Sequence, residues 1–363
     1  MATDAIVVGA GIIGGSIAWR LSQLGLRVCL VDAGRVGGEA SWAGAGMLAP
    51  GGEIEERTPW ADFAVESLRL YPRFIEELEA ESGLSIDYQR LGAVEVVVSP
   101  EATIQFEARA RLQAELGIPS FPLGARQMAE RVPLARKEVA AVRFYPEDAI
   151  VDPRDVMHAL HAACLRRGVE IREGWRVDSI RPEPSSVEVI SGNSVLRSTA
   201  AVLAAGAWSS QIAAEGFSLP VSFPVRGHLI GFYLEPGSLG PILRSGHTYM
   251  VQRANGFTIA GSTQERVGFN RTPDPALFAA IHQRAAELIP LLAGRAPDES
   301  WIGFRPALES GSPAIGRLED TALWLAYGHF RNGILLAPAT AGRMAGEITT
   351  NSRTGSPALP CTK

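Results

Sequence analysis

The chain has 363 residues, of which 46% are hydrophobic and 20% charged, a composition typical of globular proteins with sizeable cores. Its formal net charge of -5 provides no basic surface for nucleic acid or for an anionic membrane. Cys29, Cys164 and Cys361 lie far apart without CxxC spacing, which argues against a disulfide framework or a metal site. The first residues carry Asp4 and only a short apolar run, so we expect a cytoplasmic protein without a targeting segment.

The N-terminal segment has the pattern of a βαβ unit that binds a dinucleotide. Residues 5–8 form a continuously apolar run, as in a strand buried on both faces, and a predicted helix over about 14–23 leads to a second strand that ends at Asp32. Asp32 stands where a carboxylate accepts hydrogen bonds from an adenosine ribose. A GxGxxG motif links the first strand to the helix, with glycines suited to a tight turn, to close approach of a pyrophosphate and to helix packing: Gly9, Gly11 and Gly14.

A run of small residues, GGEASWAGAGMLAP, follows the second strand at 37–50. The βαβ pattern alone does not distinguish NAD from FAD. A long run of small residues can lie against an extended ligand without side-chain clashes, which favours FAD. A flexible glycine loop is the alternative interpretation.

Later segments return to the same kind of fold. A helix and strand are predicted within 151–177, and 201–210 has the pattern of another buried strand that ends in a small-residue turn. Residues 86–98 and 223–263 are typical of strands joined by turns, with a hairpin signal at Asn255-Gly256. Helices are expected near 64–83, 101–115 and 275–291.

The predicted fold class is α/β, with a Rossmann-like FAD-binding domain of the glutathione-reductase type and an inserted α+β domain on an antiparallel or mixed sheet. We expect the FAD-binding domain to be discontinuous, over 1–85, 150–215 and 305–363. The substrate-binding domain is expected over 86–149 and 216–304.

The segment GHFRNGILLAPATAG, 328–342, places a charged residue in apolar sequence. Read locally, Asn332-Gly333 is a hairpin turn between two strands and Arg331 an ordinary solvated charge. Pro338 suits the first turn of a helix that runs to about Thr349. Arg331 is costly to bury unless it meets a negative charge. An incoming carboxylate ligand and a fixed Asp or Glu of the chain are the two candidate partners.

With GAGIIGGSIAWRLSQLG, WAGAGMLAP, GHTYMV, GSTQERVGFNRTPD, WIGFRPALESGSPAIG and GHFRNGILLAPATAG in this order, the chain resembles the glycine oxidases of thiamine biosynthesis. These belong to the FAD-dependent D-amino-acid oxidase family. The resemblance implies oxidative deamination of glycine or another small amino acid. Hydride transfer to flavin N5 would give an imine, then a 2-oxo acid and ammonia, and oxygen would reoxidise the flavin to yield hydrogen peroxide.

The resemblance also implies site residues. Arg331 would hold the substrate carboxylate through two parallel hydrogen bonds, with help from the Tyr249 hydroxyl and from a second arginine, Arg305. His247 would line the pocket entrance, and Gln264 would lie beside the substrate where several glycine oxidases carry an apolar residue. Cofactor contacts from the βαβ unit and the resemblance are expected at Gly9, Gly11, Ile12, Ile13, Gly14, Asp32, Ala33, Ala40, Ser41, Ala45, Gly46, Met47, Val177, His329, Phe330, Asn332, Gly333, Ile334 and Leu335.

Several functional alternatives stay open from the sequence. A related flavoenzyme acting on sarcosine, proline or another D-amino acid would use the same carboxylate clamp. A dehydrogenase would pass electrons to a quinone or a protein instead of oxygen, and a non-catalytic flavin-binding protein is a third class. The segment RPALES carries no cysteine for a flavin linkage, so FAD is expected to be non-covalent. No protein general base is expected to be essential, and a homo-oligomer is left open.

Overall fold

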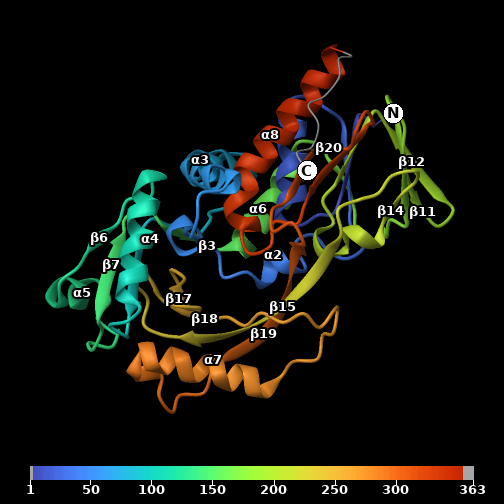
Figure 1. The fold of residues 1–363 in the computed structure, drawn as a ribbon. Coiled ribbons are helices and arrows are strands. Elements are labelled where there is room, and N and C mark those ends of the chain that lie inside the picture. The colour runs from blue at the N-terminus through green and yellow to red at the C-terminus, as the bar shows by residue number, and fades with distance from the viewer. Residues whose placement is uncertain (1–2, 355–363) are drawn as a thin grey trace.

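The computed structural model describes residues 3–354, and a six-stranded sheet forms the centre of one half of the molecule (Figure 1). Its strand order is β20-β21-β13-β1-β2-β9. The pairs from β21 to β9 are parallel and β20 is an antiparallel edge strand. The strands are β1 (Ala5–Val8), β2 (Val28–Val31), β9 (Glu170–Arg172), β13 (Ala200–Leu203), β20 (Ala314–Arg317) and β21 (Leu323–Tyr327).

Alternating side chains of this sheet face two different layers. Ala5 and Val7 of β1 pack among helices on one face, while Ile6 and Val8 pack on the other face against a four-stranded sheet. The helices are α1 (Ile12–Gln23), α3 (Pro59–Ser82), α6 (Pro153–Arg166) and α8 (Gly333–Thr354). The four-stranded sheet contains β10 (Ser179–Pro182), β11 (Val187–Ser191), β12 (Ser194–Ser198) and β14 (Ala213–Ala214). Burial on both faces explains why β1, β2, β13 and β21 are apolar throughout.

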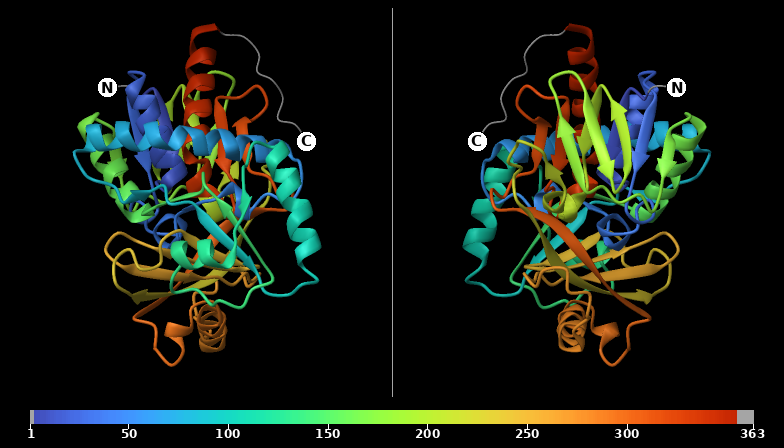
Figure 2. Two further views of the ribbon diagram at one scale, coloured as in Figure 1. Left: turned by 90° about the vertical axis from the view of Figure 1, so that its left-hand side faces the viewer. Right: turned by 90° about the vertical axis from the view of Figure 1, so that its right-hand side faces the viewer.

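An eight-stranded sheet forms the other half of the molecule, in the order β19-β15-β18-β17-β16-β5-β7-β6. Its pairs are antiparallel except β16 with β5, so the predicted mixed sheet is confirmed. Figure 2 shows α7 (Pro275–Leu288) beneath the face turned away from the six-stranded sheet. The strands are β5 (Ala93–Val97), β6 (Phe121–Pro122), β7 (Ala141–Tyr145), β15 (Ser222–Tyr233), β16 (Ile242–Ser245), β17 (Thr248–Gln252), β18 (Phe257–Gly261) and β19 (Glu299–Leu308).

Short elements join the two halves. The small-residue run 37–50 contains a short helix and a strand, so it is not a featureless loop. That strand, β3, pairs with β8, which pairs with β4, and the three bring together segments that are distant in sequence. The elements not named so far are α2 (Ala40–Ala43), β3 (Met47–Leu48), η1 (Pro50–Gly52), β4 (Tyr88–Gln89), α4 (Thr103–Glu115), α5 (Ala125–Arg131), β8 (Ala149–Val151), η2 (Gly206–Gln211) and η3 (Pro290–Leu292).

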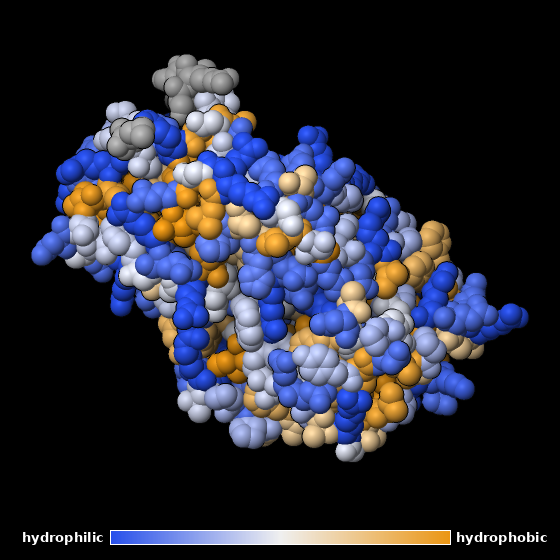
Figure 3. Space-filling view, turned by 180° about the vertical axis from the view of Figure 1, so that it is seen from behind, coloured by the Kyte–Doolittle hydropathy of each residue, from blue (hydrophilic) through white to orange (hydrophobic). Residues whose placement is uncertain are grey.

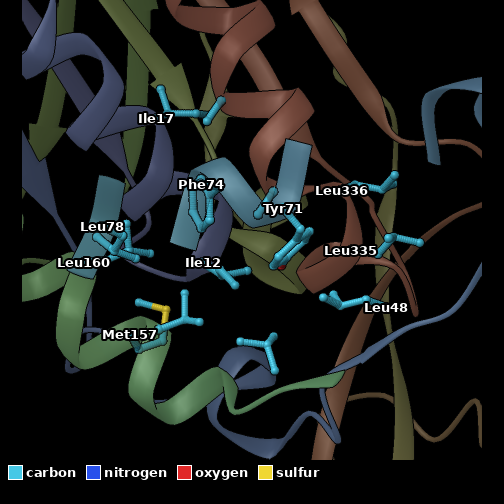
Figure 4. Packing of buried hydrophobic residues seen from close by; sticks show 14 of the residues in the cluster. Ile12, Ile17, Leu48, Tyr71, Phe74, Leu78, Met157, Leu160, Leu335 and Leu336 are labelled. Carbon is cyan, nitrogen blue, oxygen red and sulfur yellow. The ribbon is translucent and has the colours of Figure 1, made fainter. Parts of the chain in front are cut away.

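The start of α8 differs from the sequence prediction. Asn332-Gly333 is not a hairpin turn, because the helix begins at Gly333 and Pro338 lies inside it. A proline within a helix leaves the carbonyl four residues earlier without its N–H donor. Here Tyr71 Oη donates to that carbonyl, Ile334 O, at 2.5 Å, and Ser67 Oγ donates to Leu335 O at 2.7 Å. Helix α3 therefore completes the hydrogen bonding of α8 in the core that Figure 4 shows.

The outer surface shows no continuous apolar face in the view of Figure 3, where hydrophilic and apolar side chains alternate. Between residues 3 and 354, no helix has the length and hydropathy needed to cross a membrane. Over the same range, no cluster of His, Cys, Asp and Glu is suited to hold a metal ion. Cys29 and Cys164 are buried free thiols, and Cys361 lies outside the described residues.

Candidate functional site

A cleft of about 670 Å³ is lined by residues from both halves of the molecule. This volume lies within the usual range for small-molecule and cofactor sites. The six-stranded sheet contributes the carboxyl ends of β1 and β2, and α1 points its N-terminus at the cleft. The eight-stranded sheet contributes β15, β17 and β19, and the turn before α8 closes one end.

The glycine motif has the geometry its spacing predicts. Gly9 has a φ of 104°, and a β-carbon there would lie 2.4 Å from the carbonyl oxygen of Ala204. On Gly14 a β-carbon would lie 1.8 Å from the carbonyl oxygen of Gly9, so only glycine lets α1 pack this close to the preceding turn. Gly11 caps α1 without a side-chain hydrogen bond and the first turn has no acidic residue. The positive end of the helix is therefore left for an anionic ligand.

Asp32 is held by backbone N–H groups of the glycine turn and of the loop that follows β2. The Ala10 N–H donates to Oδ2 of Asp32 and the Gly34 N–H donates to Oδ1, both at 2.7 Å. Ser41 of the small-residue run supports the motif from the other side, because its Oγ accepts from the Ile12 N–H at 2.9 Å. The βαβ turn and the 37–50 segment therefore form one cradle.

At the other end of the cleft, residues 328–334 form a tight turn into α8. Phe330 has a φ of 49°, which is uncommon for a residue other than glycine, and its N–H donates to Pro306 O at 2.7 Å. His329 is buried, with Nε2 3.2 Å from Thr340 Oγ1. Burial lowers the pKa of the His329 imidazole to about 3, so the ring is neutral at pH 7.

The structure brings nearly all the predicted cofactor residues to the cleft wall and leaves two away from it. Gly14 faces the Gly9 carbonyl behind the wall, and Leu335 is buried in the core beside α3. The residues that line the cleft are Gly9, Gly11, Ile12, Ile13, Asp32, Ala33, Ala40, Ser41, Ala45, Gly46, Met47, Val177, His329, Phe330, Asn332, Gly333 and Ile334.

Across the eight-stranded sheet, strand register places Arg305 and Tyr249 on the face that borders the cleft. Two glycines between them make the room. A β-carbon on Gly227 would lie 2.3 Å from Nη1 of Arg305, and one on Gly261 would lie 2.5 Å from the Tyr249 hydroxyl. Gly227 lies on β15 beside β19, and Gly261 pairs with Tyr249 between β18 and β17. The absence of side chains at Gly227 and Gly261 therefore leaves space on this face of the sheet for the Arg305 guanidinium and the Tyr249 phenol.

Arg305 is held by neutral groups. Its Nη1 donates to the carbonyl oxygen of Thr263 at 3.0 Å and its Nη2 donates to Ser262 Oγ at 2.7 Å. Among residues 3–354, no carboxylate forms an ion pair with it. Burial lowers the pKa of the Arg305 guanidinium, and the positive charge of Arg331 acts in the same direction. Tyr249 and the carboxylate of Glu53 act on this pKa in the opposite direction. An arginine remains protonated despite such a shift, so Arg305 is a cation without a carboxylate in direct ion-pair contact.

Arg331 is different, because its Nη2 donates to Oε1 of Glu53 at 2.8 Å. Burial raises the pKa of the Glu53 carboxyl, while Arg331, Arg244 and Arg305 oppose the shift. Of the two partners open to Arg331 from the sequence, the fixed carboxylate is the one present. Both side chains line the cleft, so the pair contributes to its wall.

The two remaining predicted pocket residues have different positions. His247 is exposed at the rim of the cleft, as expected for an entrance residue. Gln264 is exposed and is not among the residues that line the cleft, so its position beside the substrate stays a prediction. Next to it, Glu265 forms an antiparallel bridge with Arg226. Gln264 lines a second depression with Phe223, and Gly328 and Phe330 border both this depression and the cleft.

Sequence reasoning missed several residues of this site. Glu53 follows a glycine-rich turn and has no local signal that it pairs with Arg331. Arg244 lines the cleft and is buried with ion pairs to Glu95 and Asp148. A buried arginine is usually paired with carboxylates, so an arginine in a predicted inner strand indicates a buried ion pair. The sequence does not show which carboxylates form that pair.

Comparison with known proteins agrees with this geometry. A family model described as FAD dependent oxidoreductase matches residues 4–347. The chain belongs to this family. A glycine oxidase of Bacillus subtilis is 31% identical over 96% of this chain and 93% of its own length. The bifunctional protein ThiO/ThiG of Synechocystis is 32% identical over 93% of this chain and 50% of its own length. The crystal structure of a glycine oxidase from Geobacillus kaustophilus superposes with a TM-score of 0.91 and 28% identity, covering 96% of this chain and 95% of that one.

Membership in the family makes the chain a flavoenzyme that uses FAD. The cradle fits such a cofactor, because side chains at Gly9 and Gly14 would block the turn beside α1 and Asp32 is fixed at the end of β2. The predicted family resemblance and fold class are confirmed.

Proposed function

We propose that the protein oxidatively deaminates glycine or another small amino acid, giving an imine that water converts to a 2-oxo acid and ammonia. The observation that best supports this proposal is Arg305 on the cleft wall. Its guanidinium lies beside Tyr249 and has no carboxylate in ion-pair contact among the described residues. When bound, FAD supplies the oxidant that accepts the hydride from the substrate α-carbon. The glycine oxidases that match along nearly the whole chain support this assignment.

In this proposal Arg305 is the main carboxylate-binding residue and Arg331 is secondary. A planar guanidinium makes two parallel charge-assisted hydrogen bonds to a carboxylate. Arg305 has no competing carboxylate among the described residues, whereas Arg331 already binds Glu53. The Tyr249 hydroxyl, close to Arg305, donates a further hydrogen bond to the same substrate group. A carboxylate fixed at this point would orient the substrate α-hydrogen toward the flavin ring.

The remaining ionisable groups argue for a reaction without a protein base. Asp32 accepts two backbone hydrogen bonds, Glu53 is paired with Arg331, and His329 is neutral and buried. His247 lies at the exposed rim, and Glu39, which also lines the cleft, is exposed and forms an ion pair with Arg271. We propose that the substrate enters with a neutral amine, whose lone pair assists loss of the hydride.

We also propose the division of the chain between the two tasks. Segments 1–85 and 150–215 with the C-terminal segment hold the cofactor, and 86–149 with 216–304 hold the substrate. Strand β19 runs unbroken through 305, so we propose to move the last boundary to the end of that strand at Leu308.

The finer assignments rest on the relatives. The matching half of ThiO/ThiG, with the resemblance to glycine oxidases of thiamine biosynthesis, supports a role in that pathway. Oxygen as electron acceptor with release of peroxide, non-covalent FAD, a cytoplasmic location and a possible homo-oligomer complete the proposal.

An anaerobic titration tests the proposed function. The purified protein with FAD is mixed in turn with glycine, sarcosine and D-alanine, and the flavin absorbance is followed. The expected result is loss of the oxidised flavin spectrum with at least one amino acid and release of peroxide when air is admitted. Flavin that stays oxidised with all of them would refute amino-acid oxidation. Reduction without peroxide would instead indicate a dehydrogenase with another electron acceptor.

A further inference from the structure

The tripeptide Arg226-Gly227-His228 on β15 connects the cleft to a loop on the opposite face of the sheet. Gly227 faces the cleft and leaves room for the Arg305 guanidinium. Because side chains alternate along a strand, Arg226 and His228 point to the other face, and both are buried. There they hold the loop 262–274, whose first residues bind Arg305.

Thr263 is the direct link between His228 and Arg305. Its hydroxyl accepts from the His228 backbone N–H at 3.0 Å, and His228 Nδ1 lies 3.0 Å from the same oxygen. Its carbonyl accepts from Arg305 Nη1, also at 3.0 Å. A displacement of Thr263 therefore removes one of the hydrogen bonds that orient the guanidinium.

The His228 ring is fixed by its neighbours on every side. Its Nε2 accepts from the Asp274 N–H at 3.0 Å, so the ring proton belongs on Nδ1, which lies 3.0 Å from Glu265 Oε2. Glu265 in turn forms two hydrogen bonds with the Arg226 guanidinium. The charges that face His228 are thus those of Glu265, Arg226 and Asp274, and burial lowers the pKa of the imidazole despite the two carboxylates.

The same network extends along the loop. Arg226 Nη1 also donates to the carbonyl oxygens of Asn270 at 3.1 Å and Thr272 at 2.6 Å. The backbones of Arg226 and Glu265 exchange hydrogen bonds at 2.9 and 3.0 Å. The loop is therefore attached to β15 at both its ends, and its conformation follows that of the strand.

We propose that His228 and Thr263 are positioning residues that hold Arg305 in the orientation that binds the substrate carboxylate. The inference rests on the proposed function for the role of Arg305. Neither His228 nor the Thr263 hydroxyl touches the substrate. His228 and Thr263 change substrate affinity only by fixing the orientation of the Arg305 guanidinium.

Variants at Thr263 test this role with acetate as an unreactive carboxylate probe. Acetate binding is measured from the perturbation of the flavin absorbance spectrum, and KM and kcat are measured with glycine. In Thr263→Val the acetate Kd and the KM are expected to rise about tenfold, the effect of losing one hydrogen bond that orients a charged group. The kcat is expected to change less than about threefold, because Ser262 Oγ still holds Nη2 of Arg305 and a substrate that does bind meets the same guanidinium.

Two comparisons separate positioning from a general structural effect. Thr263→Ser keeps the hydroxyl and is expected to restore acetate affinity. Thr258→Val removes a buried hydroxyl from β18, next to the loop, where Thr258 Oγ1 donates to Gly256 O at 3.0 Å, and this variant should leave acetate affinity unchanged. If Thr263→Val does not fold, Thr263→Ala replaces it with the same readouts.

An unchanged acetate Kd in the folded Thr263→Val or Thr263→Ala variant would overturn the proposal. So would equal weakening by Thr263→Ser, because the hydroxyl would then be irrelevant, or a native protein that binds no acetate. A native protein that binds acetate but oxidises no amino acid refutes the proposed function alone. In that case the acetate titrations still decide the positioning role.

Discussion

Two arginines lie in one cleft with opposite electrostatic surroundings. Arg305 is bonded to a carbonyl and a hydroxyl, while Arg331 is bonded to the carboxylate of Glu53. A cation without a counter-ion gains more from an incoming anion than a cation that is already neutralised. The difference between the two sites therefore lies in their partners and not in the arginines themselves.

The arginine variants are expected to differ in substrate binding. Arg305→Ala should weaken binding of glycine and acetate by about 2 to 5 kcal/mol, the usual effect of removing one member of a desolvated charge pair. Arg331→Ala should weaken it by less than about 1.4 kcal/mol, or tenfold, because Glu53 already neutralises that side chain. Acetate Kd and kcat/KM for glycine provide the measurement, with FAD content checked in each variant.

Arg331→Ala leaves Glu53 without its partner, so the double variant Arg331→Ala/Glu53→Gln is the control for an unpaired carboxylate. If Arg331→Ala and the double variant both lose more affinity than Arg305→Ala, the order of the two arginines is reversed.

The sequence identified both arginines but not which one is free. Arg305 and Arg331 each stand in apolar sequence, and the resemblance marks both. The partner of Arg331 is 278 residues away along the chain, so only the folded molecule brings the two together. The local sequence indicates that an arginine in apolar surroundings needs an anionic partner. Only the tertiary structure shows whether that partner is a carboxylate of the chain.

At the scale of elements, α8 depends on α3. Pro338 removes a hydrogen bond inside α8 close to the end that lines the cleft, and Tyr71 supplies the missing donor to Ile334 O. Figure 4 shows Tyr71 between the two helices with Leu335 and Leu336 nearby. Burial raises the pKa of the Tyr71 hydroxyl well above its ordinary value, so the group remains a donor. The turn that carries Arg331 is thus supported from a second helix.

Removing this donor is expected to destabilise the protein. Tyr71→Phe leaves the partly buried Ile334 carbonyl without its donor, and an unsatisfied buried group typically costs about 1 to 3 kcal/mol. Urea unfolding followed by circular dichroism measures the change. The matched control is Tyr233→Phe, since the Tyr233 side chain is exposed and its hydroxyl is 3.2 Å from Glu299. Equal stability of the two variants would contradict the assigned role of Tyr71.

The helices and strands were predicted correctly where the apolar pattern or the turn signal is strong. The prediction was wrong where a distant side chain compensates for a proline inside a helix. The apolar run at 5–8, the hairpin at Asn255-Gly256 and the helix near 101–115 are found as expected. Helix α8 begins before Pro338, although a proline normally favours the first turn. The compensating hydroxyl belongs to α3, so no window of sequence around Pro338 contains the information.

At the scale of the whole molecule, composition and strand patterns were sufficient to predict two sheets and a cofactor cleft. They were not sufficient to place every side chain relative to that cleft. The resemblance places Gln264 beside the substrate, whereas in the structure it lines a depression next to the cleft, beside the bridge between Arg226 and Glu265. The Glu53–Arg331 pair likewise joins a loop of one segment to the turn before the last helix.

The buried His329 imidazole makes the stability of the molecule depend on pH. Its folded pKa of about 3 lies below the ordinary value of 6.5, so the unfolded chain takes up the proton first. The contribution of the neutral His329 to the free energy of unfolding is therefore complete above pH 6.5, and it is lost progressively as the pH falls toward 3. The loss is expected to be about 1.4 kcal/mol per pH unit within this window.

Urea unfolding at a series of pH values checks this expectation. His329→Asn should flatten the dependence between pH 6.5 and 3, because its amide does not titrate. His158→Asn, at an exposed position of α6, should keep the native slope. A native slope in His329→Asn would assign the acid sensitivity to other groups.

The packing of α8 against α1 and α3 has a consequence for biosynthesis (Figure 1). Strand β21 pairs beside β13 in the same sheet as β1, so the earliest and latest segments share one core. During translation helix α1 can pack against α6 as soon as residues 153–166 are made, but its contacts with α8 form only after residues 333–354 follow. A nascent chain therefore completes its flavin cradle only after residues 323–354 have been made, and a ribosome-bound chain halted before β21 should not retain FAD.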